Sequence, residues 1–443
     1  MAFDKAAFGA KLAELRKSAG LTQLVAARML GVTDKAVSKW EKGGSFPSME
    51  TLVKISELYH VQIGELFEAA ERNTQRIVSI VLTGGPCSGK SSASGWIVAD
   101  MQKKGWRVVF VPESATELIN AGVSPKTCGS QLAFQRCVMA LQVTKEEQYR
   151  RFAAGLPNEN VLLVFDRGVM DSKAYLRGVE FAGLLRENGL SEVEARDRYD
   201  AVFHLVSAAK DDPERYETTS NAARRETPAQ ARALDDKTLR AWKGHPRLRV
   251  IGNTDGLEGK LKRLIAELSD VTGTPGPRRL QRKYLVEMPN LAALEGLPGC
   301  AKVEAVQTYL KGEPGFEVRV RRRGSEGDFL YTKTVKEQAS AGVELRRIAS
   351  EERLTESEYL SELANADPDL APLRKTRYCL CEGDRCLQLD VFPFWKDRAM
   401  LEVPVADKYD EPAVPKMFKV IEEVTDDPAY RNYNLAKTSA KNC

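Results

Sequence analysis

The stretch IVSIVLTGGPCSGKSS, residues 77–92, joins an apolar run to a glycine-rich loop and then to a helical segment. Within it, GGPCSGKS at residues 84–91 satisfies the pattern G-x-x-x-x-G-K-S between a strand and a helix, which is the context this motif requires. Backbone N–H groups of such a loop surround phosphate oxygens at a helix N-terminus. The stretch therefore predicts an α/β part that binds a nucleoside triphosphate, ATP or GTP, with Mg²⁺.

Nucleotide contacts are expected from this phosphate-binding loop (P-loop) and from one later segment. The Lys90 ammonium would face the β and γ phosphates, and the Ser91 hydroxyl would hold Mg²⁺. The segment GNTD at residues 252–255 follows a later apolar run, at the usual place for contacts to the base. The expected nucleotide-binding residues are Gly84, Gly85, Pro86, Cys87, Ser88, Gly89, Lys90, Ser91, Ser92, Asn253 and Asp255.

Charged side chains also follow two other apolar runs. VLLVF ends in Asp166 and Arg167, and RVVFVPE ends in Glu113. A carboxylate beside the loop binds the metal or its water shell, so Ser91 and Asp166 are the expected metal ligands. The Asp-Arg pair resembles nucleoside and nucleotide kinases, in which the arginine meets the substrate and an acid at the position of Glu113 serves as the base. A structural role for Glu113, such as a helix cap, is an equal alternative.

The segment from Asp211 to His245 is rich in arginine and acids, and it follows the fourth apolar run, where kinases carry a lid. Arg215, Arg224 and Arg225 would close over the phosphates and stabilise the transferring charge. The alternative is a solvated pair of helices. The expected catalytic residues are Lys90, Asp166, Arg167, Glu113 and Arg224.

Residues 77–270 resemble the P-loop family that contains nicotinamide riboside kinase and the TRPL translocation defect protein of insects. The shared features are GGPCSGKS, PE-x-A-T-E-L, FDRG, and an N-x-x-R-x-E lid followed by Trp and His-Pro. The resemblance implies kinase or NTPase activity.

The chain has 443 residues, enough for two to three domains. Apolar runs from Ile77 alternate with helical stretches, which predicts a parallel sheet covered by helices that ends near Leu268. TGTPGPRR then breaks the chain as a linker. We expect three parts: an all-α helix-turn-helix at 1–70, an α/β P-loop parallel sheet at 71–272, and an antiparallel β barrel with α+β character at 278–443.

The N-terminal part reads as short helices. Leu12 and Leu15 share a face with Phe8 in the first, Thr22 caps the second, and Thr33 caps a third that runs through about Glu41. The second helix carries Val25, Ala26 and Leu30, Gly31 makes the following turn, and Ser48 caps a fourth helix with Leu52, Ile55 and Leu58. Ile63, Leu66 and Phe67 suggest a fifth.

The sequence LTQLVAARMLGVTDKAVSKWEKGGSFPSMETLVKI resembles the XRE or Cro-repressor type of helix-turn-helix. That type inserts the N-terminal side chains of its third helix into the major groove of DNA. The expected DNA-binding residues are Gln23, Lys35, Ser38, Lys39 and Lys42. Proteins of this type commonly act as dimers, so a homodimer is the default expectation. The alternative is a helical bundle kept for dimerisation or protein contact.

From Arg279 onward, KYLVEM, FEVRVRRR, FLYTKTVK, RYCLC, LQLDVF and AMLEVPV predict alternating antiparallel strands. With LRKTRY and the late YRNYNLA they resemble the CYTH, or triphosphate tunnel, domain. That family closes a barrel whose inward Arg and Lys side chains, at alternating strand positions, hold a polyanion. The expected polyanion-binding residues are Lys283, Arg319, Arg321, Arg323, Lys333, Arg374 and Arg377.

The sequence departs from that family at its acidic positions. The family opens with Glu-x-Glu-x-Lys, but Arg279 and Gln281 stand at the two acidic places before Lys283, and Pro404 replaces a later acid. Because Mg²⁺ requires carboxylate ligands, hydrolysis of a triphosphate is not expected here. Binding of a polyphosphate, a nucleotide, a phospholipid head group or RNA is expected instead. The alternative is a basic outer face with no ligand.

Composition excludes some classes of protein. The net charge is only +4, so any basic surface is local. No run of about 18 apolar residues appears, and the charged N-terminus lacks an apolar signal core, so no membrane span and a cytoplasmic location are expected. The eight cysteines are scattered, and the cluster of Cys379, Cys381 and Cys386 lacks partners for a zinc site. We therefore expect reduced, structural thiols.

Four functions remain open. The first is a cytoplasmic regulator that couples ATP or GTP binding, or phosphoryl transfer, to DNA binding and polyanion sensing. This architecture parallels the repressor-kinases of NAD metabolism by analogy only. The second is a metabolic kinase for a nucleoside or a small phosphate compound. The third is a non-catalytic switch that binds nucleotide together with lipid or nucleic acid, and the fourth is a triphosphatase.

Overall fold

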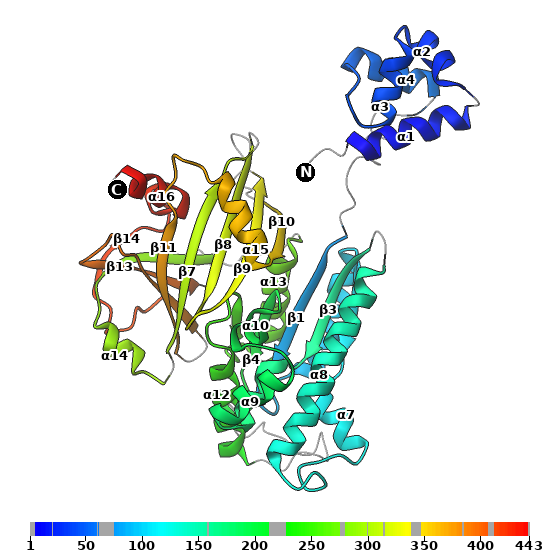
Figure 1. Cartoon of the computed structure of the whole chain (residues 1–443). Helices are drawn as coiled ribbons and strands as arrows, with labels where there is room; N and C mark the ends of the chain where they lie inside the picture. The colour runs from blue at the N-terminus through cyan, green and yellow to red at the C-terminus, as the bar shows by residue number, and fades with distance from the viewer. Residues whose placement is uncertain are drawn as a thin grey trace. The chain divides into compact units, whose positions relative to one another are not determined.

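The computed structural model divides into two compact units, Met1–Gln75 and Arg76–Cys443 (Figure 1). The structure describes residues 5–19, 21–59, 61, 75–156, 159–211, 227–274, 280–298, 300–312, 315–337, 347–382, 385–405 and 412–441. Within these ranges, no helix combines the length and the apolar character that crossing a lipid bilayer requires.

The first unit is helical, as predicted. Its helices are α1 (Lys5–Ser18), α2 (Gln23–Leu30), α3 (Asp34–Glu41) and α4 (Met49–Tyr59). The Thr22 hydroxyl accepts the Val25 N–H, the Thr33 hydroxyl accepts the Ala36 N–H, and Gly31 ends α2 at φ 71°. Side chains from all four helices make one core: Phe8, Leu12, Ala27, Leu30, Val37, Trp40, Leu52 and Ile55. The predicted N-caps therefore start α2 and α3.

One detail of this unit differs from the expectation, and one predicted helix falls outside the described residues. Val25, expected among the apolar residues of α2, is 39% exposed, and Ala27 lies in the core instead. The helix turns by about 100° per residue, so the buried stripe follows Ala26, Ala27 and Leu30. The predicted fifth helix, with Ile63, Leu66 and Phe67, falls outside the described residues.

The second unit begins with a five-stranded parallel sheet in the order β2-β3-β1-β4-β5. Its strands are β1 (Ile77–Thr83), β2 (Trp106–Val111), β3 (Asn160–Asp166), β4 (Ala201–Leu205) and β5 (Leu248–Ile251). All five predicted apolar runs form these strands. Helices cover both faces of the sheet, and most side chains of β1, β3, β4 and β5 are buried, whereas β2 is buried only at Trp106 and Val111.

The helices of this part are α6 (Lys90–Lys103), α7 (Ser114–Asn120), α8 (Gln131–Ala154), α9 (Gly178–Glu187), α10 (Glu192–Asp197), α11 (Ala208–Asp211), α12 (Pro228–Trp242), α13 (Gly256–Thr272) and the 3-10 helix η1 (Val169–Tyr175). Apolar side chains of α6 and α13 pack on one face of the sheet. Those of α8, α9, α10 and α12 pack on the other. The strand ends that carry the expected site residues therefore meet at one edge between two helical layers.

The rest of the unit is an antiparallel sheet of nine strands in the order β10-β9-β8-β7-β11-β12-β13-β6-β14. Its strands are β6 (Leu280–Glu287), β7 (Cys300–Leu310), β8 (Phe316–Ser325), β9 (Asp328–Glu337), β10 (Arg347–Leu354), β11 (Leu373–Glu382), β12 (Arg385–Val391), β13 (Arg398–Val405) and β14 (Val420–Glu423). The helices around it are α14 (Leu291–Glu295), α15 (Glu356–Glu362), α16 (Asn432–Lys441) and the short η3 (Leu363–Asn365) and η4 (Pro428–Tyr430). This strongly curved sheet is consistent with the predicted CYTH-like barrel (Figure 1).

The two sheets contact each other through buried charges. The Asp197 carboxylate at the end of α10 pairs with Arg323 of β8 and, at 2.6 Å, with the neighbouring Arg196. Arg323 also donates to the Gly244 carbonyl, and Arg353 of β10 donates to the Asp197 carbonyl. Burial alone would raise the pKa of Asp197, but the two guanidinium charges outweigh it and hold that pKa well below its usual value.

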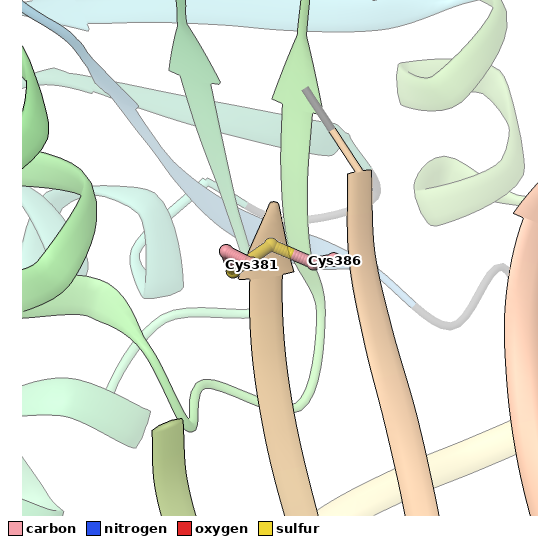
Figure 2. The surroundings of a disulfide bond; sticks show 2 residues. All are labelled: Cys381 and Cys386. Carbon is pink, nitrogen blue, oxygen red and sulfur yellow. A yellow bond between two sulfur atoms is a disulfide. The ribbon is translucent and has the colours of Figure 1, made fainter. Parts of the chain in front are cut away.

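One pair of cysteines differs from the expectation of reduced thiols. Cys381 and Cys386 form a disulfide at the ends of β11 and β12 (Figure 2). The two residues are directly opposite in the strand register, with their Cα atoms 4.1 Å apart. The pair packs against the apolar core of the parallel sheet. The expectation is therefore wrong for this pair, because the sequence alone did not show that a tight hairpin makes them partners.

Candidate active site

The P-loop begins where β1 ends and closes where α6 begins. Gly84 has φ 139°, and a side chain there would clash with the Leu205 carbonyl oxygen, which lies 2.1 Å from the place of a Cβ atom. Gly89, at φ 90°, is the N-cap of α6. Only glycine adopts these positions without strain. The two glycines of the motif are thus explained by the tight turn that the backbone makes between β1 and α6.

Lys90 lies over its own loop. Its Nζ is 3.3 Å from both the Gly84 carbonyl and the Ser88 hydroxyl oxygen. Burial and the nearby Arg167 lower the pKa of Lys90 to about 8, although Asp166 and Glu113 oppose this. Among the described residues no carboxylate forms an ion pair with Lys90, and a triphosphate bound in the loop would supply an anionic partner.

Asp235 on α12 holds the start of the loop, a role that the sequence did not reveal. Its Oδ1 accepts the N–H of Gly85 at 2.7 Å and the N–H of Ser207 at 3.2 Å. Its Oδ2 pairs with Lys210 at 2.8 Å and lies 3.2 Å from His204. Asp235 is fully buried. Its hydrogen bonds therefore connect the P-loop, the residue that follows β4 by two positions, and α12.

The expected metal ligands fit Mg²⁺. Asp166 ends β3 and pairs in register with Leu82, directly before the P-loop. Its Oδ1 is buried and has no hydrogen-bond partner among the described residues. Burial raises the pKa of Asp166 above its ordinary value, and the Lys90 charge opposes this. Ser91, at the start of α6, is exposed. An orphaned carboxylate oxygen beside a phosphate loop is the kind of donor that Mg²⁺ takes.

No cluster of three or more His, Cys, Asp or Glu side chains that could hold a metal ion exists within the described ranges. Mg²⁺ in phosphoryl-transfer sites usually takes one or two protein ligands and draws the others from phosphates and water. Two protein ligands, such as the expected Ser91 and Asp166, would agree with that number.

Arg167 and Glu113 lie together at the same edge of the sheet. The Arg167 Nε donates to Glu113 Oε1 at 2.6 Å. Arg167 has φ 69°, a conformation that costs a non-glycine residue about 1–2 kcal/mol and that clusters at functional sites. Burial raises the pKa of Glu113, but the charges of Arg167 and Lys90 outweigh it, so the carboxylate stays ionised. Although Glu113 is the N-cap residue of α7, its side chain makes no capping hydrogen bond.

Asp171 organises this edge, and sequence reasoning missed it. It accepts hydrogen bonds from the Thr83 hydroxyl, the Gly168 N–H and the Trp242 indole N–H, the last two at 2.9 and 3.2 Å. It also pairs with Arg167 at 3.3 Å. The side chain therefore connects the ends of β1, β3 and α12. No local pattern in the sequence marks Asp171 as the link between these elements, because Thr83 and Trp242 lie 88 and 71 positions away from it along the chain.

A cavity of about 290 Å³, the acceptor cavity, opens beside these residues. Glu113, Arg167 and Asp171 lie at its polar end, and Ile119, Phe134 and Val138 are among its apolar lining residues. It shares Glu113 and Arg167 with the edge that carries the P-loop, so a small molecule in it lies next to the expected phosphates.

Other predicted nucleotide contacts are bound to protein groups. The Asn253 amide donates to the Ser207 carbonyl at 3.1 Å and to Asp211 at 2.7 Å, and Asp255 pairs with Arg263. Asn253 and Asp255 both lie in the short segment between β5 and α13. The lid arginines Arg215, Arg224 and Arg225 lie outside the described residues.

Four of the five predicted DNA-binding residues lie on one side of α3 or directly after its end: Lys35, Ser38, Lys39 and Lys42. Lys35, Lys39 and Lys42 are exposed, whereas Val37 and Trp40 point into the core. Gln23 is placed differently from the expectation of a phosphate contact, since its amide donates to Glu41 Oε2 at 2.8 Å, beside Arg16. The lysine face remains available to a phosphate backbone.

We predict that Lys39→Ala weakens binding of the full chain to a mixed-sequence duplex. Losing one phosphate contact should reduce the slope of log K against log salt by about one unit. Fluorescence anisotropy across a salt series measures both quantities. Lys54→Ala, an exposed lysine on α4, is the control. An unchanged slope in the Lys39 variant would show that α3 does not face the DNA.

One face of the antiparallel sheet gathers the expected basic residues, and we call it the arginine face. Strand register places these side chains on it: Lys283, Arg319, Arg321, Arg323, Lys375 and Arg377. The Arg377 guanidinium pairs with Asp390 at 2.6 Å and with Glu402 at 3.1 Å, and Lys375 pairs with Asp390 at 2.6 Å. Arg319 Nε is buried and has no hydrogen-bond partner within the described ranges, and the Arg321 guanidinium lies 3.9 Å from Glu351.

Two of the predicted polyanion-binding residues lie elsewhere, and a third is already paired with an acid. Lys333 pairs in register with Val320, on the opposite side of the sheet, and bonds to Glu362 of α15. Arg374 is exposed on that opposite side, because it is an odd number of residues from Arg377 on the same strand. Arg323 shares the arginine face but is committed to Asp197. Lys375, which the sequence analysis did not select, takes a place on the face.

Fold and site together define a P-loop nucleotide-binding α/β protein that carries a helix-turn-helix. Residues 79–259 match a family described as an AAA domain, and residues 12–66 match one described as a helix-turn-helix. The HTH-type transcriptional activator BcrR of Enterococcus faecalis is 44% identical over 64 residues, which are 14% of this chain and 31% of that protein. The chain spans 31–35% of the length of the curated regulators that it matches.

Solved structures give weaker similarities. The inorganic triphosphatase NE1496 is 24% identical with a TM-score of 0.26, over 36% of this chain and 94% of that chain. Thymidylate kinase from Candida albicans is 15% identical with a TM-score of 0.34, over 45% of this chain and 93% of that chain.

Proposed function

We propose that this protein is a DNA-binding regulator that binds ATP or GTP with Mg²⁺ and transfers the terminal phosphoryl group to a small molecule in the acceptor cavity. The observation that carries the proposal is the shared edge. Glu113 and Arg167 line the cavity, Asp166 ends β3, and Lys90 at the start of α6 is near enough to feel the charge of all three. The resemblance to nicotinamide riboside kinase implies the same chemistry.

The residues have distinct roles in this proposal. A hydroxyl oxygen of the acceptor attacks the γ-phosphorus, the bond from that phosphorus to the β–γ bridging oxygen breaks, and the nucleoside diphosphate leaves. The ionised Glu113 carboxylate takes the hydroxyl proton. Lys90 and Arg167 stabilise charge on the transferring group. Mg²⁺, when bound, would neutralise phosphate charge, with Ser91 and Asp166 as its protein ligands.

The arginine face supports a second part of the proposal, the sensing of a polyanion. Asp390 and Glu402 pair with Arg377, whereas Arg321 lies 3.9 Å from Glu351 and the buried Arg319 Nε has no hydrogen-bond partner among the described residues. Burial, together with Arg323, lowers the pKa of Arg321 to about 10. A phosphate-rich ligand, a polyphosphate or a lipid head group, would supply the missing negative charge.

The first test measures ADP release from Mg²⁺-ATP with a panel of nucleosides, sugars, hydroxylated amino acids and vitamins. Stimulation by one compound is the expected result. Tight nucleotide binding without stimulation by any compound would favour a non-catalytic switch. Phosphate release that survives Lys90→Ala would point to a triphosphatase in the antiparallel sheet.

We predict that Glu113→Gln lowers kcat by about 100- to 10,000-fold, because the amide cannot accept the hydroxyl proton. Affinity for Mg²⁺-ATP should change little, as measured by calorimetry. Glu147→Gln, at an exposed position on α8, is the matched control. A Glu113 variant with normal turnover would assign that residue a structural role only.

A further inference from the structure

A second cavity, of about 660 Å³, lies between η1, the start of α9 and α12, and we call it the basic cavity. It adjoins the acceptor cavity, since Tyr175 lines both. Its charged lining residues in the described ranges are four cations and one acid: Lys173, Arg177, Lys237, Arg240 and Glu180. The acceptor cavity has the opposite balance, with Glu113 and Asp171 against Arg167.

The cations on the α12 side of the basic cavity have no acidic partner. Lys237 and Arg240 are exposed and three residues apart, so they share one side of the helix. No carboxylate of the described residues forms an ion pair with either of them, and the neighbouring Asp236 pairs with Lys210 at 2.7 Å. The helix dipole favours a cation in the last turn, which accounts for Arg240 but not for Lys237.

The cations on the η1 side are paired at the surface. Arg177 pairs with Glu180 at 2.6 Å, and Lys173 pairs with Glu192. Both cations keep a solvent-exposed part, 80% of the Arg177 side chain and 34% of the Lys173 side chain. Their remaining N–H groups can therefore donate to a ligand in the cavity while the acids stay in place.

The size and the other walls of the basic cavity indicate an organic ligand rather than a bare ion. A volume of about 660 Å³ is in the range of small-molecule sites. Its uncharged lining residues are apolar or aromatic: Ala174, Tyr175, Leu176, Leu234 and Ala241. Lysine and arginine bind phosphate and carboxylate oxygens through charge-assisted hydrogen bonds. Two cations without an acid call for a ligand that carries at least two negative charges.

The elements on both sides of the basic cavity also hold the nucleotide site. η1 carries Asp171, which accepts the indole N–H of Trp242 on α12 at 3.2 Å. α12 also carries Asp235, which accepts the Gly85 N–H of the P-loop. An anion that bridges η1 and α12 would hold these two elements together and so stabilise both contacts. Because coupling between two binding sites is reciprocal, such an anion would tighten nucleotide binding.

We propose that the basic cavity binds a small organic anion with at least two negative charges, a phosphate ester or a polycarboxylate, and that this anion is an effector of nucleotide binding. None of the residues to which the proposed function gives a chemical role lines this cavity. The inference therefore goes beyond the proposed function and does not require phosphoryl transfer.

The test is calorimetry on the full chain, saturated with Mg²⁺ and a non-hydrolysable ATP analogue so that the P-loop is filled. The probes are fructose 1,6-bisphosphate, tricarballylate and uncharged fructose, at constant free Mg²⁺. One or both anions should bind, and much more tightly than fructose. The double variant Lys237→Ala with Arg240→Ala should weaken that binding by about 10-fold or more, because hydrogen bonds to charged groups are lost.

A second titration tests the effector role. The anion that binds should raise the affinity of the unaltered chain for the ATP analogue by about 5-fold or more, and it should not do so in the double variant. Anion binding that leaves the affinity for the ATP analogue unchanged would overturn this role.

Two further variants make the location of the anion certain. Lys103→Ala with Lys262→Ala removes the same charge from exposed positions on α6 and α13 and should leave anion binding unchanged. Arg321→Ala reports binding at the arginine face, and the Tm of each variant without anion reports its folding. The inference fails if neither anion binds, if the Lys237 and Arg240 variant binds as well as the unaltered chain, or if only Arg321→Ala abolishes binding.

Discussion

Lys90→Ala is expected to reduce nucleotide turnover by about 100- to 1,000-fold, the loss typical when one charge-stabilising group is removed from a transition state. The structure explains the size of the effect. The Lys90 ammonium lies within the loop, with its Nζ 3.3 Å from the Gly84 carbonyl. The charged groups Asp166 and Glu113 beside it are acids, so they cannot replace its positive charge. No other described lysine occupies the loop.

Steady-state ADP release and binding of a fluorescent ATP analogue measure this change. Lys103→Ala is the matched control, because Lys103 is exposed near the end of the same helix, α6. Turnover should be normal in the control. Turnover that persists in the Lys90 variant would place the activity outside the P-loop.

Asp197→Ala is expected to destabilise the second unit by about 3–5 kcal/mol, because it leaves Arg196 and Arg323 as buried charges without their carboxylate. Only 6% of each arginine is exposed, so water cannot replace the lost partner. The same carboxylate holds the parallel sheet to β8. We therefore expect a lower Tm together with weaker coupling between the two sheets.

Thermal unfolding monitored by calorimetry tests this expectation. Asp397→Ala removes an exposed partner of Arg398 and should shift the free energy of unfolding by less than about 0.5 kcal/mol. The lowered pKa of Asp197 adds a pH signature. A depressed folded-state pKa gives stability above the ordinary aspartate pKa and loses it as the pH falls below about 4. A Tm equal to that of the Asp397 variant would contradict a buried ion-pair role.

Much of the fold followed from local patterns. The runs at Ile77–Thr83 and Asn160–Asp166 are mostly apolar because helices cover both faces of the sheet, and this leaves a strong signal in the sequence. Thr22 and Thr33 were recognisable as N-caps because their partners are three residues away. The helical N-terminus, the parallel sheet and the antiparallel sheet are therefore confirmed in type.

The parts that were missed depend on distant partners or on strand phase. Asp235 meets Gly85 across 150 positions of the chain, and no spacing rule connects them. Lys333 and Arg374 lie on the other side of the sheet from Arg377, because which side of a strand faces inward is fixed only by its neighbours in the sheet.

The central claim is that residues 84–91 bind a nucleoside triphosphate with Mg²⁺. The most direct measurement is isothermal titration of the full chain with a non-hydrolysable ATP or GTP analogue, with Mg²⁺ and again with excess EDTA. The account predicts one saturable site per chain that is strongly weakened by EDTA and absent in Lys90→Ala. No heat of binding at millimolar analogue, or equal binding in the Lys90 variant, would contradict it.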